Sequence, residues 1–423
     1  MSREGRASGL RPDQIQLLLP LGTAVSLSLA GDSTLYAVLS NQAEVVGISL
    51  AAVGVLLGAN RLIRIPGNPL AGVLNDRLGR RRLFLLGLFL GMLSTLAYGW
   101  AYGFWPMLAA RLLWGTAWAL INVGGYTMVL DRSTAADRGR MTGFYQTSYM
   151  LGLSLSPIIG GALTDALGFR PAVRICALIT GVGLVIALLF LPETRQQEAG
   201  PPAGGGSRRS RLTAKAVLHN LRGMDRQVWA VAFLYLVIFL VSNGVLMSTI
   251  SLYLAQRWGT SISLGSLVVG VSSVAGAMLS MRAALGVVAG PLAGSVSDRL
   301  RDRWPVAAVA LLITLAGFVL LTQRVSVLLA FAAVMLVASG AGALIAVLAA
   351  LVGDRVGGDR PGVAMGALAT AGDIGSAMGP LLGYALAVRM DLRWVYLLCA
   401  VILVFGLVIA LRQTQARRGS VIR

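Results

Sequence analysis

Six ionisable side chains stand inside long apolar stretches of this sequence, where a charge is costly. They are two aspartates and four arginines, namely Asp32, Arg61, Arg64, Arg111, Arg282 and Asp373. Ionisable residues in such stretches tend to face a cavity or a charged partner. A carboxylate there can gain or lose a proton as its solvation changes, and an arginine can hold an anionic group. The six residues therefore suggest proton transfer, anion binding, or both.

Asp32 and Asp373 are the candidates for carrying a proton, because no acid occupies the equivalent place in the other half of an internal repeat described below. The alternative for Asp373 is a buried ion pair with Arg61, Arg64 or Arg282 that only holds the two halves together. The four arginines exceed the two aspartates by two positive charges. That excess suits an anionic substrate bound between Arg61 and Arg282.

Further side chains are candidates for lining the same cavity. Arg61 and Arg64 are three residues apart, hence on one face of a helix, so both are expected at the cavity or at the interface between the halves. The other candidates, each of which could equally be ordinary packing, are Tyr36, Trp118, Asn122, Gln146, Tyr149 and Asn243.

The composition defines the elements that must position these residues. Of the 423 residues, 56% are hydrophobic and only 13% are charged, whereas soluble domains carry roughly 25% charged residues. Polar residues form short islands between apolar stretches of about 20 residues, the length of a helix that crosses a bilayer. Twelve such stretches occur, at 15–39, 46–73, 83–102, 106–129, 141–165, 172–191, 227–254, 264–296, 304–322, 326–352, 362–387 and 394–412. The sequence therefore predicts an all-α polytopic membrane protein with twelve transmembrane helices.

The formal net charge of +19 is unevenly distributed among the loops. With a cytoplasmic N-terminus, the outer loops hold only six basic residues, which are Arg170, Arg174, Arg257, Arg324, Arg389 and Arg393. This asymmetry follows the positive-inside rule and predicts that both termini are cytoplasmic. The basic excess then reflects topology and contact with anionic lipid, so the lipid bilayer is an expected partner and nucleic acid is not. The preference for arginine over lysine is typical of GC-rich bacterial genomes and predicts a bacterial inner membrane.

An internal repeat relates the two halves at a lag of 222 to 223 residues. The stretch N-P-L-A-G-V-L-N-D-R, which ends at Arg77, meets G-P-L-A-G-S-V-S-D-R, which ends at Arg299. Two six-helix repeats around a central site are the usual build of a transporter that alternates between inward-open and outward-open states. The expected organisation is a tail at 1–14, bundles at 15–191 and 227–412, a cytoplasmic linker at 192–226 and a second tail at 413–423.

These motifs resemble those of the major facilitator superfamily, over essentially the whole chain and especially in its twelve-helix drug–proton antiporter type. The family pattern Gly-x-Leu-x-Asp-Arg-x-Gly-Arg-Arg-Arg is similar to residues 72–82, and its fourth-helix pattern is similar to Arg111-Leu-Leu-Trp114-Gly115. The second resemblance implies a role in proton transfer for Arg111.

The first of these motifs and its repeat are expected to form a gate at the cytoplasmic face. Asp76 and Asp298 each end a helix there, so we expect each to contact a helix N-terminus or a basic side chain of the opposite bundle. The alternative for the arginines is that they only set topology. The predicted gating residues are Gly72, Asp76, Arg77, Gly79, Arg80, Asp298 and Arg299.

Glycines and prolines recur in the fifth and eleventh predicted helices. The family's antiporter motif, Gly-x8-Gly-x3-Gly-Pro-x2-Gly-Gly, resembles residues 143–161, with Ser156 in place of one glycine. Such residues let membrane helices approach closely and bend. The predicted packing residues are Gly152, Pro157, Gly160, Gly375, Gly379 and Pro380.

Together these features favour a secondary transporter that exports amphipathic small molecules in exchange for protons. One alternative is a proton-linked carrier of an organic anion, and another is a sensor or assembly partner without solute flux. A positive cavity that exposes Arg61 and Arg282 would favour the anion carrier, whereas acids exposed in an apolar pocket would favour drug export. The resemblance implies a monomer.

An enzyme is not expected. The sequence has no P-loop and no cluster of histidines or cysteines for a metal, and its only histidine, His219, lies in the linker. The expected partners are therefore a small-molecule substrate and protons, with no cofactor and no metal.

Overall fold

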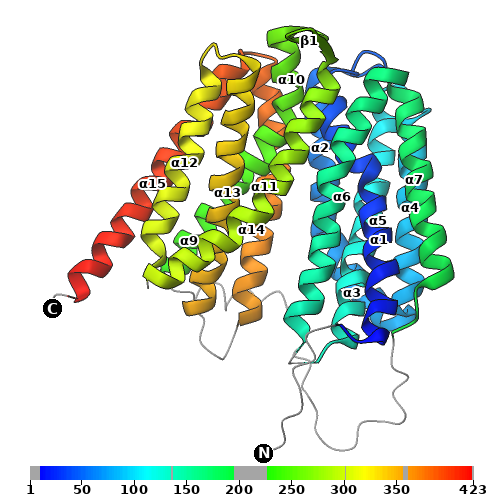
Figure 1. The fold of residues 1–423 in the computed structure, drawn as a ribbon, viewed down its shortest axis with the longest axis horizontal. Coiled ribbons are helices and arrows are strands. Elements are labelled where there is room, and N and C mark those ends of the chain that lie inside the picture. Colours follow the sequence, from blue (N-terminus) through cyan, green and yellow to red (C-terminus); the bar gives the residue numbers. More distant parts are fainter. Residues whose placement is uncertain (1–9, 135–136, 195–225, 301, 356–360, 422–423) are drawn as a thin grey trace, which may run out of the picture.

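Long helices run in alternating directions through the computed structural model, which describes residues 10–134, 137–194, 226–300, 302–355 and 361–421 (Figure 1). The first half contains α1 (Pro12–Val38), α2 (Leu50–Leu62), α3 (Arg64–Leu78), α4 (Arg80–Tyr98), α5 (Phe104–Arg132), α6 (Arg138–Leu167) and α7 (Phe169–Phe190). The second half contains α9 (Arg226–Ile238), the π-helix η1 (Phe239–Leu246), α10 (Met247–Trp258), α11 (Val271–Leu300), α12 (Arg303–Thr322), α13 (Val327–Arg355), α14 (Pro361–Ala387) and α15 (Leu392–Val421). An antiparallel hairpin of β1 (Ser261–Leu264) and β2 (Leu267–Gly270) joins α10 to α11.

These elements make twelve crossings, because α2 continues into α3 and α9 continues through η1 into α10. Within the described residues, eleven of the crossings are long and apolar enough to span a membrane, and α14, which carries Asp373, falls outside that set. The predicted all-α membrane fold of two six-helix bundles is confirmed. We call residues 12–190 the N-bundle and residues 226–421 the C-bundle.

Some boundaries differ from those predicted. The sequence predicts a membrane helix from residue 264, but the chain turns at Gly265, whose φ of 67° suits glycine, and forms β2 before α11 begins at Val271. The predicted tails are partly helical, since α1 begins at Pro12 and α15 continues to Val421 without an interrupting proline. Residues 195–225 of the predicted linker lie outside the described part of the chain.

The two ends of the molecule can be told apart by their elements. The start of α1 and the end of α15 lie on one side, which we call the terminus side, and the β1–β2 hairpin lies on the other, which we call the hairpin side (Figure 1). The bundles meet through α1, α2 and α6 of the N-bundle and α10, α11 and α14 of the C-bundle. Glycines make this contact close: a Cβ at Gly54 would lie 2.7 Å from the Pro380 carbonyl oxygen, and one at Gly58 would lie 2.8 Å from that of Ala377.

Hydrogen bonds join the bundles near the hairpin side. Asn41 donates to the Ser251 hydroxyl at 2.7 Å, and the Ile158 N–H donates to the Ser280 hydroxyl at 3.1 Å. Asp165 of α6 accepts from both the N–H and the hydroxyl of Ser273, at 2.7 and 2.6 Å. At 1.5 Å per residue, all these groups lie within about 15 Å of the hairpin-side helix ends.

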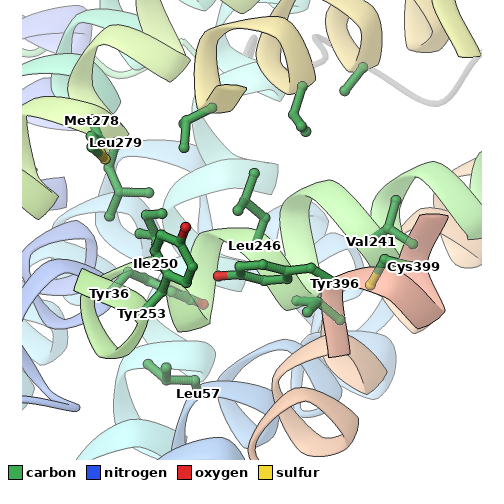
Figure 2. Close-up of a cluster of buried hydrophobic side chains, with 14 of the residues drawn as sticks. Tyr36, Leu57, Val241, Leu246, Ile250, Tyr253, Met278, Leu279, Tyr396 and Cys399 are labelled. Carbon is green, nitrogen blue, oxygen red and sulfur yellow. The ribbon is translucent and has the colours of Figure 1, made fainter. Parts of the chain in front are cut away.

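A shared apolar core fills the same region. Figure 2 shows Tyr36 and Leu57 of the N-bundle close to Leu246 and Ile250 of the C-bundle, in one cluster of buried side chains. The bundles are thus held together on the hairpin side by apolar packing as well as hydrogen bonds.

Candidate functional site

A cavity of about 640 Å³ lies between the bundles. Its wall is built by α6 on one side and by η1, α11 and α13 on the other, and most of the lining residues are apolar or glycine. The polar residues of the lining are Ser33, Arg61, Gln146, Tyr149, Asn243 and Arg282. Five of these six were predicted from the sequence as substrate-binding residues, so the structure brings most of the predicted set to one place.

Arg282 enters the cavity from α11 and is held by the irregular helix η1. Its Nη2 donates to the Ser242 carbonyl oxygen at 3.3 Å, to the Ser242 hydroxyl at 3.2 Å and to Asn243 Oδ1. The wider turn of a π-helix often occurs at functional sites. Here it places a carbonyl and two side-chain oxygens around one guanidinium group.

Arg61 approaches from the N-bundle, at a break in the second crossing. Pro66 has no N–H, so the carbonyl of Leu62 lacks its helical partner, and α2 ends there while α3 starts at Arg64. Arg61 is half-buried and interacts electrostatically with Tyr36 and Tyr149. It is also close enough to Arg282 for the two charges to repel each other.

The side chains of two arginines three residues apart take different directions, although the backbone between them stays helical, with φ of −64° and ψ of −21° at Ile63. Arg61 lines the cavity, whereas Arg64 is only 7% exposed and points into the N-bundle. Arg61 and Arg64 were both expected at the cavity or at the interface between the halves; Arg64 lies at neither, because its side chain bonds to Asn60 and lies over Trp118 inside the N-bundle.

A buried ion pair lies behind the cavity wall. Arg111 of α5 is fully buried, and its Nη1 donates to Asp32 Oδ1 of α1 at 2.6 Å. The Nε of Arg111 donates to the Leu56 carbonyl oxygen at 3.3 Å, and its guanidinium carbon lies 5.6 Å from the centre of the Tyr36 ring. Asp32 and Arg111, predicted separately for proton coupling, are thus direct partners.

Asn60 connects this ion pair to Arg64. It was not among the residues predicted from the sequence. Its Nδ2 donates to Asp32 Oδ1 at 2.9 Å, and its Oδ1 accepts from Arg64 Nη2 at 3.1 Å. The signal that could have found it is an asparagine inside an apolar stretch, four residues before an arginine and hence on the same helix face.

Aromatic rings connect Arg64 to the cavity. Its guanidinium carbon lies 5.4 Å from the centre of the Trp118 ring, and Trp118 packs against Tyr149 with ring centres 5.4 Å apart. Tyr149 lines the cavity, whereas Trp118 and Tyr36 are buried behind it. Asn122 is half-buried and is not part of the lining.

Asp373 lies apart from this network. It is half-buried on α14, and its charge interacts with Tyr235 of α9. Asp373 is not part of the cavity lining, and no arginine of the described residues forms an ion pair with it. The structure therefore does not bring the second predicted proton carrier to Asp32.

The predicted gating residues cluster on the terminus side. Asp76 pairs with Arg80 at 3.7 Å, and Asp298 pairs with Arg303 at 2.8 Å, so these ion pairs lie within one bundle. Gly79 turns the chain between α3 and α4 with φ of 96°, while Arg77 and Arg299 are exposed and Gly72 lies in α3. The expected contact of each aspartate with the opposite bundle is not among these pairs, because the hydrogen bonds described above between the bundles lie on the hairpin side.

The predicted packing residues lie at helix contacts. A Cβ at Gly152 or Gly160 would collide with α1, and one at Gly375 or Gly379 would collide with α9 or η1. Pro157 and Pro380 stand inside α6 and α14, and their carbonyl oxygens face Gly276 and Gly54 of the opposite bundle.

Known proteins are similar to this chain in sequence. The sequence model of the major facilitator superfamily matches residues 21–285 and 233–421. The chain is 25% identical over 371 residues to a multidrug resistance protein MdtG of Enterobacter lignolyticus, covering 86% of this chain and 83% of the relative. It is 27% identical over 334 residues to a class G tetracycline resistance protein of Vibrio anguillarum, covering 78% of each.

A solved structure has the same fold. It is a bacterial homologue of the human lysosomal transporter Spinster in an inward-facing and unoccupied conformation, with a TM-score of 0.77 and 18% identity over 95% of this chain and 97% of that one. Family match and fold agree with the two pseudo-symmetric bundles and the cavity between them. The chain is therefore a membrane transporter, not an enzyme, and belongs to the major facilitator superfamily.

Proposed function

We propose that this transporter exports amphipathic small molecules in exchange for protons. The observation that carries the proposal is the buried Asp32–Arg111 pair, which is joined through Asn60, Arg64 and aromatic rings to a largely apolar cavity. A carboxylate that can lose or regain its partner is a device for taking up and releasing a proton. The multidrug and tetracycline resistance proteins to which the chain is similar support export of amphipathic compounds.

Alternating access provides the transport step. In the structure the bundles are held together on the hairpin side, while the cavity is lined by parts of α6, α11 and α13 nearer the terminus side. If the terminus side is cytoplasmic, as the charge distribution predicts, this is the inward-facing arrangement. The opposite arrangement requires the hairpin-side contacts to break and α3 to approach α14 on the terminus side. We propose that a monomer performs this cycle in a bacterial inner membrane, with both termini in the cytoplasm.

The charge of the cavity favours a second candidate, a proton-linked carrier of an organic anion. Arg61 and Arg282 line the cavity from opposite bundles, and none of the described lining residues is an acid. A positive cavity that exposes both arginines favours a substrate with an anionic group. Protonation of Asp32 adds one positive charge behind the wall, which helps an anion to bind and opposes a cation. A cation would therefore exchange with a proton, whereas an anion would move together with one.

The direction of proton movement tests the two candidates. The full chain is reconstituted into liposomes with a pH-sensitive dye inside, and either tetraphenylphosphonium, a lipophilic cation, or Lucifer yellow, a fluorescent disulfonate, is added. Proton movement opposite to tetraphenylphosphonium supports the exporter, and proton movement together with Lucifer yellow supports the anion carrier. Flux of either probe that leaves the internal pH unchanged contradicts proton coupling altogether.

A further inference from the structure

The side chain of Asn60 is fully buried and makes hydrogen bonds at both ends of its amide group. Nδ2 donates to Asp32 at 2.9 Å and Oδ1 accepts from Arg64 at 3.1 Å. The orientation of the amide follows from its partners, because an ionised aspartate only accepts and an arginine only donates. Asn60 thus joins the acid proposed to carry the proton to an arginine that lies over Trp118, behind the cavity wall.

We propose that Asn60 is a positioning residue that transmits the protonation state of Asp32 to the cavity; the inference rests on the proposed proton coupling. An ionised carboxylate is a strong acceptor and holds both Arg111 and Asn60. A protonated carboxyl group accepts more weakly, so the Asn60 Nδ2 bond is lost or lengthened. Because the amide is planar and rigid, a rotation that moves Nδ2 from Asp32 also moves Oδ1 from Arg64.

Arg64 converts that rotation into a change at the cavity. It is the first residue of α3, directly after the helix break, and its Nε has no hydrogen-bond partner among the described residues. Its guanidinium lies over Trp118, which packs against the cavity residue Tyr149. Release of Arg64 from Asn60 therefore frees a cation that stacks on Trp118 directly behind the wall, near the Arg61 charge that the substrate meets.

The backbone around Asn60 is tightly packed, so a change at Asp32 is met by rotation of the side-chain amide and not by a shift of the helix. Gly115 of α5 faces this point, and a Cβ there would lie 2.7 Å from the Asn60 carbonyl oxygen and 3.2 Å from Oδ1. In this proposal the Asn60 amide is an element with two arrangements, whose equilibrium both Asp32 and Arg64 influence.

The test uses Asn60→Leu, which keeps the volume but removes both hydrogen bonds. Asn75→Leu is the matched control, because Asn75 is also a buried asparagine of the second crossing but neither polar atom of its amide side chain has a hydrogen-bond partner in the described structure. The Kd values of tetraphenylphosphonium and Lucifer yellow are measured between pH 5 and 9 on the full chain in lipid nanodiscs. One coupled proton changes the wild-type Kd by up to about tenfold per pH unit.

We expect Asn60→Leu to reduce this dependence to less than about threefold per pH unit, while the Kd at the alkaline end stays within about threefold of wild type. Asn75→Leu should keep the wild-type slope. If Asn60→Leu does not fold, Arg64→Met can be used instead. It removes the hydrogen bond between Arg64 and Asn60 and should reduce the pH dependence of Kd in the same way. Where both fold, the double variant should lose no more than either single variant, since the two residues act in series.

The outcomes distinguish the role of Asn60 from the proposed proton coupling at Asp32. A wild-type slope that survives in Asn60→Leu or in Arg64→Met overturns the role of Asn60 and leaves proton coupling at Asp32 intact. A wild-type Kd that is independent of pH for both probes overturns the proposed proton coupling and, with it, the inference.

Discussion

The two bundles share one fold but differ in what they bury at the same depth. When D-S-T-L-Y of the first half is laid on T-I-S-L-Y of the second, Asp32 meets Thr249, and a lag of 223 residues brings Arg111 onto Val334. Asp32 and Arg111 form a buried ion pair. Thr249 instead bonds to the hydroxyl of Tyr396 at 3.1 Å, and Val334 is fully buried in the apolar core.

This difference shows that the fold itself does not require a buried ion pair at these two positions. At the two equivalent positions the C-bundle has the neutral residues Thr249 and Val334, although it carries Arg282 and Asp373 elsewhere, so the buried ion pair of the N-bundle is an addition. Burying two charges has a large desolvation cost that their attraction rarely exceeds. The N-bundle has this desolvation cost at these two positions and the C-bundle does not. We attribute the difference to function, namely the proposed proton coupling.

The strongest test gives the N-bundle the residues of the C-bundle. The double variant Asp32→Thr/Arg111→Val should lose all proton movement coupled to the probes, because no carboxylate remains next to the cavity wall. Its thermal stability should stay near that of wild type, since replacing a buried pair with neutral residues is often neutral. Flux assays with an internal pH dye, together with thermal unfolding, measure both properties.

The single variant Arg111→Val is the control for that test. It leaves Asp32 buried without its cation, which should lower stability by about 3–5 kcal/mol. A double variant that still couples protons would show that the carboxylate lies elsewhere. A double variant that is as unstable as the single one would show that the pair is structural, and the contrast between the bundles would lose its functional meaning.

The cavity arginines test whether the asymmetry extends to substrate binding. Arg61→Gln and Arg282→Gln should each weaken Lucifer yellow binding by about 10- to 100-fold, because a hydrogen bond to a charged group contributes about 1.5–3 kcal/mol. Tetraphenylphosphonium binding should not weaken. Equal losses would mean that the bundles contribute equally to the substrate, whereas a loss confined to Arg61 would extend the charge asymmetry to the cavity.

Arg257→Gln is the matched control for these variants. It removes the same charge from the hairpin side, where Arg257 donates to the Gln323 carbonyl oxygen and stands outside the cavity lining. Binding of Lucifer yellow that is unaffected by either cavity variant would rule out the anion site.

A hydrogen bond between the bundles gives a smaller expected effect. Gly270, at the start of α11, has no side chain to cap that helix, and Asp165 of the N-bundle accepts from the Ser273 N–H in its place. Losing an N-cap costs about 1 kcal/mol. Asp165→Ala should therefore shift the ratio of the two arrangements about fivefold toward an open hairpin side, as measured by distances between spin labels at the hairpin ends of α7 and α12.

The control for Asp165 is a cap that lies within one bundle. Asp302 caps α12 and accepts from the Trp304 N–H at 3.2 Å, so Asp302→Ala removes a cap from both arrangements alike. It should lower stability without changing the distance distribution. The same distribution for wild type and Asp165→Ala would show that the cap does not influence the arrangement of the bundles.

Sequence reasoning found the features that are encoded locally. Twelve apolar stretches and a repeated motif are enough to predict two bundles, and the cost of burying charge identifies Arg61 and Arg282 as cavity residues. The partners of those charges depend on how each helix is rotated, which no local pattern specifies. The hydrogen bond with Asn60 holds Arg64 inside the N-bundle while Arg61 lines the cavity, and Asp373 on α14 lies outside the cavity lining. For the same reason the Asp32–Arg111 pair was foreseen as two residues but not as a contact.

The smallest expected effect concerns Asp373, the acid on α14 of the C-bundle. It lies outside the cavity lining, and its charge acts on Tyr235 without an arginine partner in the described structure. Asp373→Asn should therefore change proton-coupled flux by less than about twofold, while Asp32→Asn abolishes it. Comparing initial rates of the two variants at equal amounts in the membrane, with tetraphenylphosphonium and Lucifer yellow, measures this difference. If Asp373→Asn also abolished coupling, both bundles would carry protons, because α14 would bring Asp373 toward α3 in the other arrangement. The contrast between the two bundles would then hold for one state only.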